Sequence, residues 1–543
     1  MKQYFMGIDI GTYESRGMLI GEDFRVTAEH TMAHGMSHPR QGWFEHDADK
    51  VWWGDFCGIS RHLIEAGGIA PEQISCIGAS TLGTDCLPVD EQCRPLRPAI
   101  LYGIDSRADK EIQWLTRHYG RDVRRLFGHP ICSGDTATKI LWIKNNEPEV
   151  YRRTYKFLTG SSFITAKLTG RYVIDQFLAK GSFRPLYRAD GTVNEEECGL
   201  YCRPDQIAAC AYSTDVAGRV TREAAAQTGL AEGTPVICGT GDSTSEAISV
   251  GLTEPGTAFF QYGSSMFYYY CVDRMVQDYI SSGGNGSVKG GKVFTIPGTF
   301  CLGDGTNAAG TLTRWVRNTF YGEELEMERK GGKNAYAVMA GEAGEIQPGS
   351  EGLIILPYIY GERSPIQDPL ATGMIFGLKG SHTRKHINRA ALEAVGYSTL
   401  QHLMLFREMG LPPHTLITAG GGTKNDVWMQ IICDMTGMPL HIPETFQCSS
   451  YGDAMLAALG AGCLKDFHQL KEKLPEGRII GPDRENHEFY QRNYPIYRDL
   501  YLNNRELMHR MHMDKEMCIR DRSNTKKYKT ELLLYYQECA HHS

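Results

Sequence analysis

Excess positive charge and long apolar runs are both missing from this sequence. The net charge is −7 over 543 residues, so no overall positive field attracts nucleic acid or an anionic membrane. The longest uncharged stretch, 255–272, has glycine and serine in its middle. It is more typical of a strand, a turn and a second strand than of a membrane-spanning helix. We therefore expect neither a nucleic-acid partner nor a membrane partner.

Regularly paired cysteines are also missing. The 16 cysteines are scattered along the chain, and Asp9 interrupts the N-terminal apolar run too early for a secretory signal peptide. We therefore expect reduced thiols and a cytoplasmic protein. Cys198 and Cys202 are close in sequence, with Cys210 following, and a zinc site there is an alternative that the pattern does not favour.

One local pattern occurs twice, about 250 residues apart. Residues 4–20 and 257–271 each contain an apolar strand, a turn of glycine and hydroxyl residues, and a returning strand. Helical periodicity alternates with strands in both halves; the expected helices are 49–66, 138–145, 384–408 and 426–436. We predict an α/β protein of two duplicated domains that flank a cleft, at 1–250 and 251–500.

The C-terminal segment 514–543 continues none of these patterns. Its residues 517–522, MCIRDR, back-translate to a transposon adapter that is used in sequencing libraries. We expect 514–543 to be a non-native tail and exclude it from the predicted fold. The alternative is a genuine charged tail.

A carboxylate and a glycine turn end the first predicted strand, where residues 9–16 read DIGTYESR. Backbone N–H groups of such a turn, at Gly11 and Thr12, can hold phosphate oxygens, and Arg16 can neutralise them. Asp9 can hold Mg²⁺ through water, because Mg²⁺ keeps much of its hydration. The alternative is a plain hairpin with a polar turn.

A second carboxylate lies among glycines after the apolar strand 235–237, in CGTGDSTSE at 238–246. Glycines let a ligand approach the backbone closely. An alcohol is a poor nucleophile, so an enzyme that phosphorylates one gains from a carboxylate that accepts its proton. Asp242 suits that role, and the alternative is that it caps a helix that begins near Thr244.

A third cluster has three glycines between a strand and a helix, in TAGGGTKND at 418–426. This order presents bare N–H groups at a helix N-terminus, which suits an anion or a nucleotide. It has neither the lysine of a phosphate-binding P-loop nor the spacing of a dinucleotide fold. The alternative is a flexible loop.

Together, these clusters resemble the actin-like ATPase architecture of sugar kinases, and specifically the FGGY carbohydrate kinase family. Residues 134–146, GDTATKILWIKNN, fit its first signature; GMIFGL at 373–378 and HINRAALE at 386–393 fit the second. Segments 360–365 and 450–454 are similar to family segments too. The resemblance covers roughly 3–500 and implies two ribonuclease-H-like domains that phosphorylate a sugar or polyol hydroxyl, with ATP and Mg²⁺ as cofactors.

The resemblance also implies roles for single residues. Asp9 matches the Mg²⁺-associated aspartate, and Asp242 matches the catalytic base. The positions that match nucleotide contacts are Gly11, Thr12, Arg16, Ser264, Gly310, Gly421 and Asn425.

The sugar-contacting region departs from familiar family members. Gly83 and Thr84 replace the Arg-Glu of glycerol kinases and the Met-His of xylulose kinases, and 101–107 resembles the Trp-x-Asp-x-Arg segment with an aromatic change and one extra residue. The predicted sugar contacts are Trp43, Thr84, Asp85, Asp105, Arg107 and Asp242. The alternatives are core packing for Trp43 and a turn cap for Asp85.

The sequence therefore predicts an ATP-dependent kinase whose substrate is a ketopentose such as xylulose or ribulose, with a homodimer as the assembly to test. An alternative is another polyol or deoxy-ketose, of the glycerol, erythritol or rhamnulose type. From another class, the alternative is an actin-like or chaperone-type ATPase that acts on a protein partner, which the two long signatures disfavour. A dead sugar sensor is a third, against which intact Asp9 and Asp242 argue.

Overall fold

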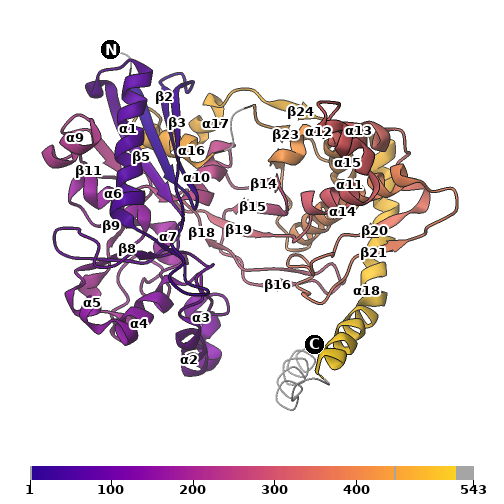
Figure 1. Ribbon diagram of the computed structural model, residues 1–543, viewed down its shortest axis with the longest axis horizontal. Helices are drawn as coiled ribbons and strands as arrows, with labels where there is room; N and C mark the ends of the chain where they lie inside the picture. The colour runs from indigo at the N-terminus through magenta and orange to yellow at the C-terminus, as the bar shows by residue number, and fades with distance from the viewer. Residues whose placement is uncertain (1–2, 445–447, 521–543) are drawn as a thin grey trace.

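The computed structural model describes residues 3–444 and 448–520. The chain forms two lobes side by side, each built around a seven-stranded sheet with helices packed against it (Figure 1). The first lobe holds most of the N-terminal half, and the second holds most of the C-terminal half. The predicted tail 514–543 begins inside the last described helix, and its residues 521–543 lie outside the described part of the chain.

The sheet of the first lobe grows from the predicted N-terminal hairpin. Strand β1 (Tyr4–Ile10) pairs antiparallel with β2 (Glu14–Gly21) and parallel with β5 (Ile74–Thr81). Both faces of β1 are covered, and most of its residues are buried, which explains its nearly continuous apolar run. The sheet is completed by β3 (Val26–Ala33), β11 (Val216–Arg219), β12 (Pro235–Ile237) and β13 (Thr240–Gly241).

The sheet of the second lobe repeats this arrangement. Strand β14 (Thr257–Tyr262) pairs antiparallel with β15 (Met266–Val272) and parallel with β22 (Thr415–Ala419). Strand β19 (Phe300–Gly305) then pairs with β15 as β3 pairs with β2. The remaining strands are β18 (Lys292–Val293), β23 (Leu440–Ile442) and β24 (Arg478–Ile480). The shared order confirms the predicted α/β fold of two duplicated ribonuclease-H-like domains.

Most predicted helices lie where the periodicity placed them. Helices α14 (Arg384–Glu408) and α15 (Asp426–Thr436) have the predicted bounds, and α4 (Thr136–Asn146) extends its prediction slightly at both ends. The expected helix 49–66 instead divides into a π-helical turn, η1 (Ala48–Trp53), and helix α1 (Gly54–Gly67). Of the helices in the described residues, none is both long and apolar enough to cross a membrane.

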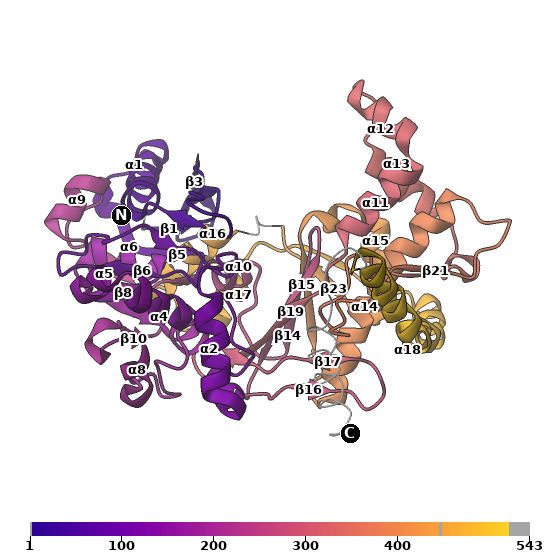
Figure 2. The ribbon, with the colours of Figure 1, turned by 60° about the horizontal axis from the view of Figure 1, so that its bottom comes forward.

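Shorter helices surround both sheets. Those of the first lobe are α2 (Asp109–Tyr119), α3 (Val123–Phe127), α5 (Pro148–Arg153), α6 (Gly160–Thr169), α7 (Gln176–Gly181), α8 (Glu195–Tyr201), α9 (Arg222–Thr228) and α10 (Asp242–Ser249). In the second lobe, α12 (Gly322–Arg329) and α13 (Ala335–Gly344) project beyond α11 (Gly310–Phe320), as Figure 2 shows. Helix α13 forms one wall of the cavity described below.

Helix α16 (Ser449–Gly460) follows strands of the second lobe in sequence but lies in the first lobe, where it packs on β1, β5 and α10 (Figure 1). The contact brings backbone against backbone: a β-carbon on Gly7 would lie 2.0 Å from the Ser450 carbonyl oxygen, and one on Gly452 would lie 1.9 Å from that of Ser245. Only glycine fits such an approach. The predicted limits 1–250 and 251–500 did not anticipate this return, and they stay a prediction.

The last helix, α18 (Arg484–Arg520), begins against the second lobe, and its C-terminal end projects beyond that lobe (Figure 1). Tyrosines on its buried side join the core of that lobe, and these are Tyr490, Tyr494, Tyr497 and Tyr501. Met508 is the last of the described side chains in this core.

Candidate active site

Carboxylates from three separate elements lie close together in the first lobe. Asp9 is near the end of β1, Asp242 and Glu246 are on α10, and Asp453 is on α16. Burial and the charges of Asp242, Asp453 and Glu246 raise the pKa of Asp9 well above its usual value. Such crowding of like charges is typical of sites that bind a cation or move a proton.

Asp242 is the first residue of α10, and Gly241 occupies the N-cap position before it. The structure therefore does not support the alternative that Asp242 is the helix cap. The Ser243 N–H donates to Asp242 Oδ1 at 2.6 Å, and burial raises the pKa of Asp242 to about 6. At neutral pH the group is ionised yet more basic than an ordinary aspartate, which suits a general base.

A serine hydroxyl joins Asp9 to Asp453. Ser80 Oγ lies 2.9 Å from Asp9 Oδ1 and 2.6 Å from Asp453 Oδ2, and Ser245 Oγ donates to Asp453 Oδ1 at 2.6 Å. One hydroxyl has one proton, so Ser80 can donate to only one of the two carboxyl groups. Burial raises the pKa of Asp453 to about 8 and raises that of Asp9 well above its usual value, so a second proton can be held between these two carboxyl groups.

Asp453 has no role in the sequence prediction, although its segment 450–454 was singled out as similar to the family. The available signal was a carboxylate inside the apolar run YGDAMLAALGAG. Ionisable residues are seldom fully buried unless they are paired. That rule marks Asp453 for attention, but it does not reveal the partners Ser80 and Ser245, which lie hundreds of residues away in sequence.

The turn after β1 lies beside these carboxylates and is bonded internally. The Gly11 N–H donates to the Glu14 carbonyl at 3.0 Å, and Thr12 Oγ1 donates to the Tyr102 hydroxyl at 3.3 Å. Arg16 pairs with Glu29 of β3 at 2.7 Å. The structure thus places Gly11, Thr12 and Arg16 next to Asp9, and their contacts to phosphate stay a prediction.

Asp85 follows β5 and is fully buried. Within the described residues, neither of its carboxylate oxygens has a hydrogen-bond partner of ordinary geometry, so Asp85 does not cap a turn. Burial raises its pKa to about 7, while Lys139 opposes this rise and Asp242 adds to it. The Tyr102 backbone N–H also acts on this carboxylate and lowers its pKa. A buried carboxylate with so few hydrogen bonds is costly, which is a reason to expect that a ligand completes its bonds.

Thr84, beside Asp85, is held through its backbone. Lys139 Nζ donates to the carbonyl oxygens of Thr84 at 3.0 Å and Ser133 at 2.7 Å. Lys139 belongs to the first family-like signature but was given no role from sequence. It fixes the segment that carries Thr84 and Asp85 to helix α4.

The other predicted sugar contacts form a buried cluster. Arg107 donates twice to Asp105 and once to Glu45, with distances of 2.7–2.9 Å, and Asp105 also accepts from the Phe44 N–H at 2.7 Å. The ring of Trp43 packs 4.3 Å from the Arg107 guanidinium. The side chains of Asp105 and Arg107 are closed to solvent. This geometry supports a structural role, in which the two side chains hold the segments of Phe44 and Glu45 in place. A direct sugar contact from them stays a prediction.

A cavity of about 540 Å³ opens in the second lobe. Four residues that the sequence assigned to nucleotide contacts all line it: Ser264, Gly310, Gly421 and Asn425. They come from the β14–β15 turn, the start of α11, and the 3₁₀ turn η6 (Gly421–Lys424) with the residue that follows it. Further lining residues that sequence reasoning missed include Arg314, Asn334, Tyr336, Asn388 and Trp428.

Close backbone contacts shape one wall of this cavity. The Gly310 N–H donates to the Gly263 carbonyl at 2.9 Å, and a β-carbon on Gly310 would lie 2.6 Å from that oxygen. Asn425 caps α15 by accepting from the Trp428 N–H at 3.0 Å. The sequence had suggested bare N–H groups at this helix N-terminus. In the structure the Asn425 side chain occupies one of these donors.

Comparison with known proteins agrees with this geometry. The chain matches the N-terminal domain of the "FGGY family of carbohydrate kinases" over residues 4–249 and its C-terminal domain over 282–461. It is 27% identical over 510 residues to a xylulose kinase of Bacillus subtilis, with 93% of this chain and 98% of the relative covered. It is 26% identical over 510 residues to a gluconokinase of the same organism, with 92% and 96% covered.

A solved xylulose kinase from Rhodospirillum rubrum has the same fold, with a TM-score of 0.81 and 27% identity over 93% of this chain and 100% of that one. The repeated sheets, the carboxylates beside the first turn and the cavity beside the second turn all accord with these matches. The chain is a sugar kinase that belongs to the FGGY family of carbohydrate kinases.

Proposed function

We propose that this kinase transfers the γ-phosphoryl group of ATP to a hydroxyl of a ketopentose such as xylulose or ribulose. The observation that carries the proposal is the position of Asp85, a buried carboxylate whose oxygens have no hydrogen-bond partner of ordinary geometry among the described residues, and which is close enough to Asp242 to interact with it. A carboxylate can accept hydrogen bonds from two neighbouring hydroxyls of a sugar, and Asp242 can accept the proton of the reacting hydroxyl.

The reaction step follows from these roles. The substrate oxygen forms a bond to the γ-phosphorus as Asp242 takes its proton, and the bond from that phosphorus to the bridging oxygen breaks to release ADP. The pKa of about 6 at Asp242 keeps the base ionised at neutral pH. Positioning and charge stabilisation supply the remaining catalysis, because phosphoryl transfer needs little covalent help from the protein.

The nucleotide is proposed to lie along the cavity of the second lobe. Apolar side chains of Met339 and Leu392 and the ring of Trp428 line it, together with the glycines of η6, a combination that suits a flat base with polar edges. Arg314 donates to Ser264 at 3.3 Å at the same wall and offers a positive charge. The phosphates would then reach toward the turn that holds Gly11 and Thr12.

The donor set beside this path fits Mg²⁺. Asp9, Asp242 and Glu246 present carboxylate oxygens, which are the ligands that Mg²⁺ prefers, and the raised pKa of Asp9 reflects a site where added positive charge is favourable. We propose that Asp9 holds the ion, which would neutralise charge on the phosphates. A bound cation would lower the pKa of Asp9 again, against the burial and the neighbouring carboxylates that raise it.

Gluconate is the second candidate, because one of the similar relatives is named a gluconokinase. The local charge argues against it. Asp85, Asp242 and Asp9 gather carboxyl groups where the substrate would lie, and the pKa values of Asp9 and Asp85 are already raised there, so an added anion is unfavourable. A neutral ketose or polyol fits this charge better.

Turnover of ATP with a panel of substrates tests the proposal. The panel contains xylulose, ribulose, glycerol, erythritol, rhamnulose and gluconate, with a no-sugar control. We expect the highest kcat/KM with a ketopentose. A preference for gluconate would overturn the substrate assignment, and ATP turnover that ignores every hydroxyl compound would overturn the kinase mechanism.

A thermal shift screen gives an independent measurement of binding. With nucleotide present, a true substrate at a hundred times its dissociation constant stabilises the fold by about 2.7 kcal/mol. We also propose that the protein is cytoplasmic. We propose a homodimer as its assembly, which size-exclusion chromatography with light scattering measures directly.

A further inference from the structure

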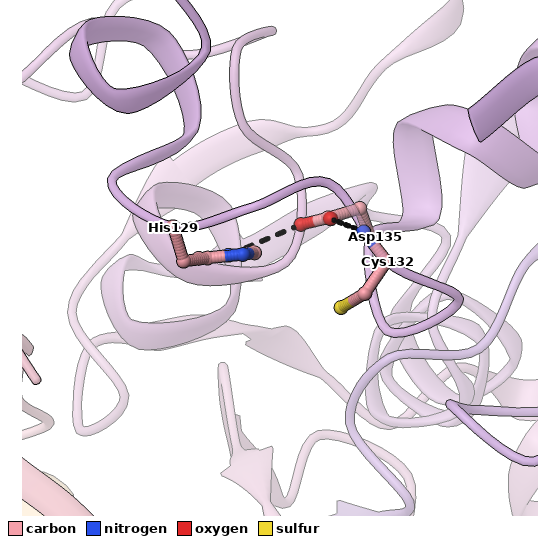
Figure 3. A group of neighbouring side chains, drawn as sticks. All are labelled: His129, Cys132 and Asp135. Atoms are coloured by element: carbon pink, nitrogen blue, oxygen red, sulfur yellow. Dashed lines mark hydrogen bonds and ion pairs between the residues drawn. The ribbon is translucent and has the colours of Figure 1, made fainter. Parts of the chain in front are cut away.

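A group of metal-binding side chains lies outside the site described above, in the loop before α4. His129, Cys132 and Asp135 offer an imidazole nitrogen, a sulfur and a carboxylate oxygen within 4.8 Å of one another (Figure 3). Among the residues that the structure describes, no other three histidine, cysteine or acidic side chains meet at this spacing. Cys198 and Cys202, the alternative raised by the sequence, are therefore not part of such a group.

The separations suit a small tetrahedral ion. His129 Nε2 lies 3.3 Å from Asp135 Oδ1. Ligand atoms around tetrahedral Zn²⁺, at bond lengths of about 2.0–2.3 Å, are roughly 3.3–3.8 Å apart. The imidazole and the carboxylate thus already have the separation that an ion between them requires, and only the sulfur has to adjust.

Outer hydrogen bonds orient two of the three ligands. His129 Nδ1 lies 2.9 Å from the Pro130 carbonyl oxygen, so the Nδ1–H tautomer can donate there and leave Nε2 free to bind an ion. The Cys132 N–H donates to Asp135 Oδ2 at 2.8 Å, which turns Oδ1 toward His129. Metal-binding imidazoles and carboxylates in proteins are usually held in this way.

The group is open to solvent on one side. Asp135 is buried, His129 is partly exposed, and Cys132 is exposed. An ion can therefore enter from the Cys132 side, and a fourth position remains for water. Three protein ligands with one open position is the arrangement of many Zn²⁺ sites that are not purely structural.

We propose that His129, Cys132 and Asp135 bind a divalent transition-metal ion of the Zn²⁺ type. Sulfur and imidazole ligands favour Zn²⁺ and Co²⁺, whereas Mg²⁺ takes oxygen ligands. The Mg²⁺ that the kinase reaction is proposed to use would therefore not compete at this group. Ion binding here does not depend on the proposed substrate.

Charged groups beside Asp135 act on an incoming ion. Arg184 and Lys139 interact with Asp135, and their positive charges oppose the incoming cation at every pH at which they are charged.

The site adjoins the segment proposed to contact the sugar. Ser133, between two of the ligands, donates through Oγ to the Gly103 carbonyl at 2.6 Å, and its own carbonyl accepts from Lys139, which also binds Thr84. A bound ion would fix this loop against Thr84. That consequence rests on the proposed function, whereas ion binding itself does not.

Cobalt substitution tests the site directly. The full-length protein is stripped with a chelator and titrated with Co²⁺. We expect one equivalent to produce a thiolate-to-cobalt charge-transfer band in the near ultraviolet with the visible bands of a tetrahedral ion. Cys132→Ser, a one-atom change at an exposed position, abolishes the charge-transfer band. Cys463→Ser, the matched variant at the other exposed described cysteine, leaves it unchanged.

Competition with a chromophoric chelator measures Zn²⁺ affinity. Loss of an outer-shell partner costs roughly 10–100-fold in metal affinity. His129→Gln and Asp135→Asn each remove a ligand, so each weakens Zn²⁺ affinity by more than that. Circular dichroism verifies that both variants fold. No band in the wild-type protein overturns the proposal. So does a band that persists in Cys132→Ser, which would place the ion elsewhere in the chain, such as among the cysteines and histidines of 514–543.

Discussion

The two lobes carry different side chains at matching positions of the same sheet. Asp9 near the end of β1 corresponds to Gln261 near the end of β14. The residue paired with Asp9 on the parallel neighbour is Ser80, and the one paired with Gln261 is Ala419. Arg16, opposite Asp9 on the returning strand, corresponds to Phe267. One scaffold thus holds charge in the first lobe and neutral or apolar groups in the second.

This difference separates two tasks that a kinase must perform. Carboxylates can hold a cation and accept a proton, which belongs to the reacting end of the nucleotide. A neutral wall with glycine turns and apolar side chains suits the base end. The two ends meet where Gln261 Nε2 donates to Glu246 of α10 at 3.0 Å. The two turns thus differ in their side chains and not in their fold.

The largest expected effect is at the base. We predict that Asp242→Asn keeps the fold and ATP binding and lowers kcat by roughly 10²–10⁴-fold, the usual worth of a positioned base. Steady-state kinetics of the purified variant measure it, with Asp190→Asn, at an exposed aspartate, as the control. An unchanged kcat would show that another group takes the proton.

The matched pair Asp9 and Gln261 tests the comparison itself. Asp9→Asn should lower kcat by roughly 10²-fold and raise the Mg²⁺ concentration needed for half-maximal rate, because a bound metal supplies several kcal/mol of charge stabilisation. Gln261→Asn should change kcat by less than about 3-fold, because no charge is lost there. Both are measured in Mg²⁺ titrations. Equal losses at the two positions would mean that the lobes share the ion.

Substrate recognition should depend on Asp85. Asp85→Ala is expected to raise KM for the sugar and spare KM for ATP, with a loss of about 1.5–3 kcal/mol in kcat/KM, the usual worth of a hydrogen bond to a charged group. Asp85→Asn should lie between the wild type and Asp85→Ala. Equal damage to both KM values would point to a structural role. No effect on either would move the sugar site toward Trp43, Asp105 and Arg107.

The same carboxylate should make stability depend on pH. Its folded pKa of about 7 lies above the usual value, so between about pH 4 and pH 7 the folded protein binds the proton that the unfolded chain has lost. Stability from this group is therefore present at low pH and is lost as pH rises through 7. Asp85→Asn should have a higher melting temperature than the wild type at pH 8. The difference between the two proteins should be smaller at pH 5. A difference that is the same at both pH values would contradict the buried, unpartnered position.

The smallest effect concerns the end of the chain. Deleting 514–543 should leave melting temperature and activity unchanged, because this segment continues none of the sequence patterns that predict the fold. Thermal unfolding and kcat of the shortened protein measure this. A fall of more than a few degrees would show that the tail packs on the fold.

Local signals predicted the fold and part of the site. The alternation of strand residues and the glycine turns marked both hairpins, and periodicity alone gave the bounds of α14 and α15. Asp242 was marked by its place among glycines and then by the resemblance, and the roles of the four cavity residues came from the resemblance. What no local pattern contained was packing between distant segments: the return of α16, the contacts of Asp453 with Ser80 and Ser245, and the bracing of Arg107 by Glu45. These depend on which surfaces meet, and one sequence does not encode that in any short window.

The position of α16 has a consequence for how the protein is made. Strand β1 leaves the ribosome early, but the helix that covers it is synthesised about 440 residues later, which takes roughly 20–90 s at 5–20 residues per second. During that time one face of the first sheet, including Gly7 and its apolar neighbours, has no partner from its own chain. Contacts this distant in sequence are slow to form. The nascent first lobe therefore exposes apolar surface, and with it a risk of aggregation, until α16 has been made.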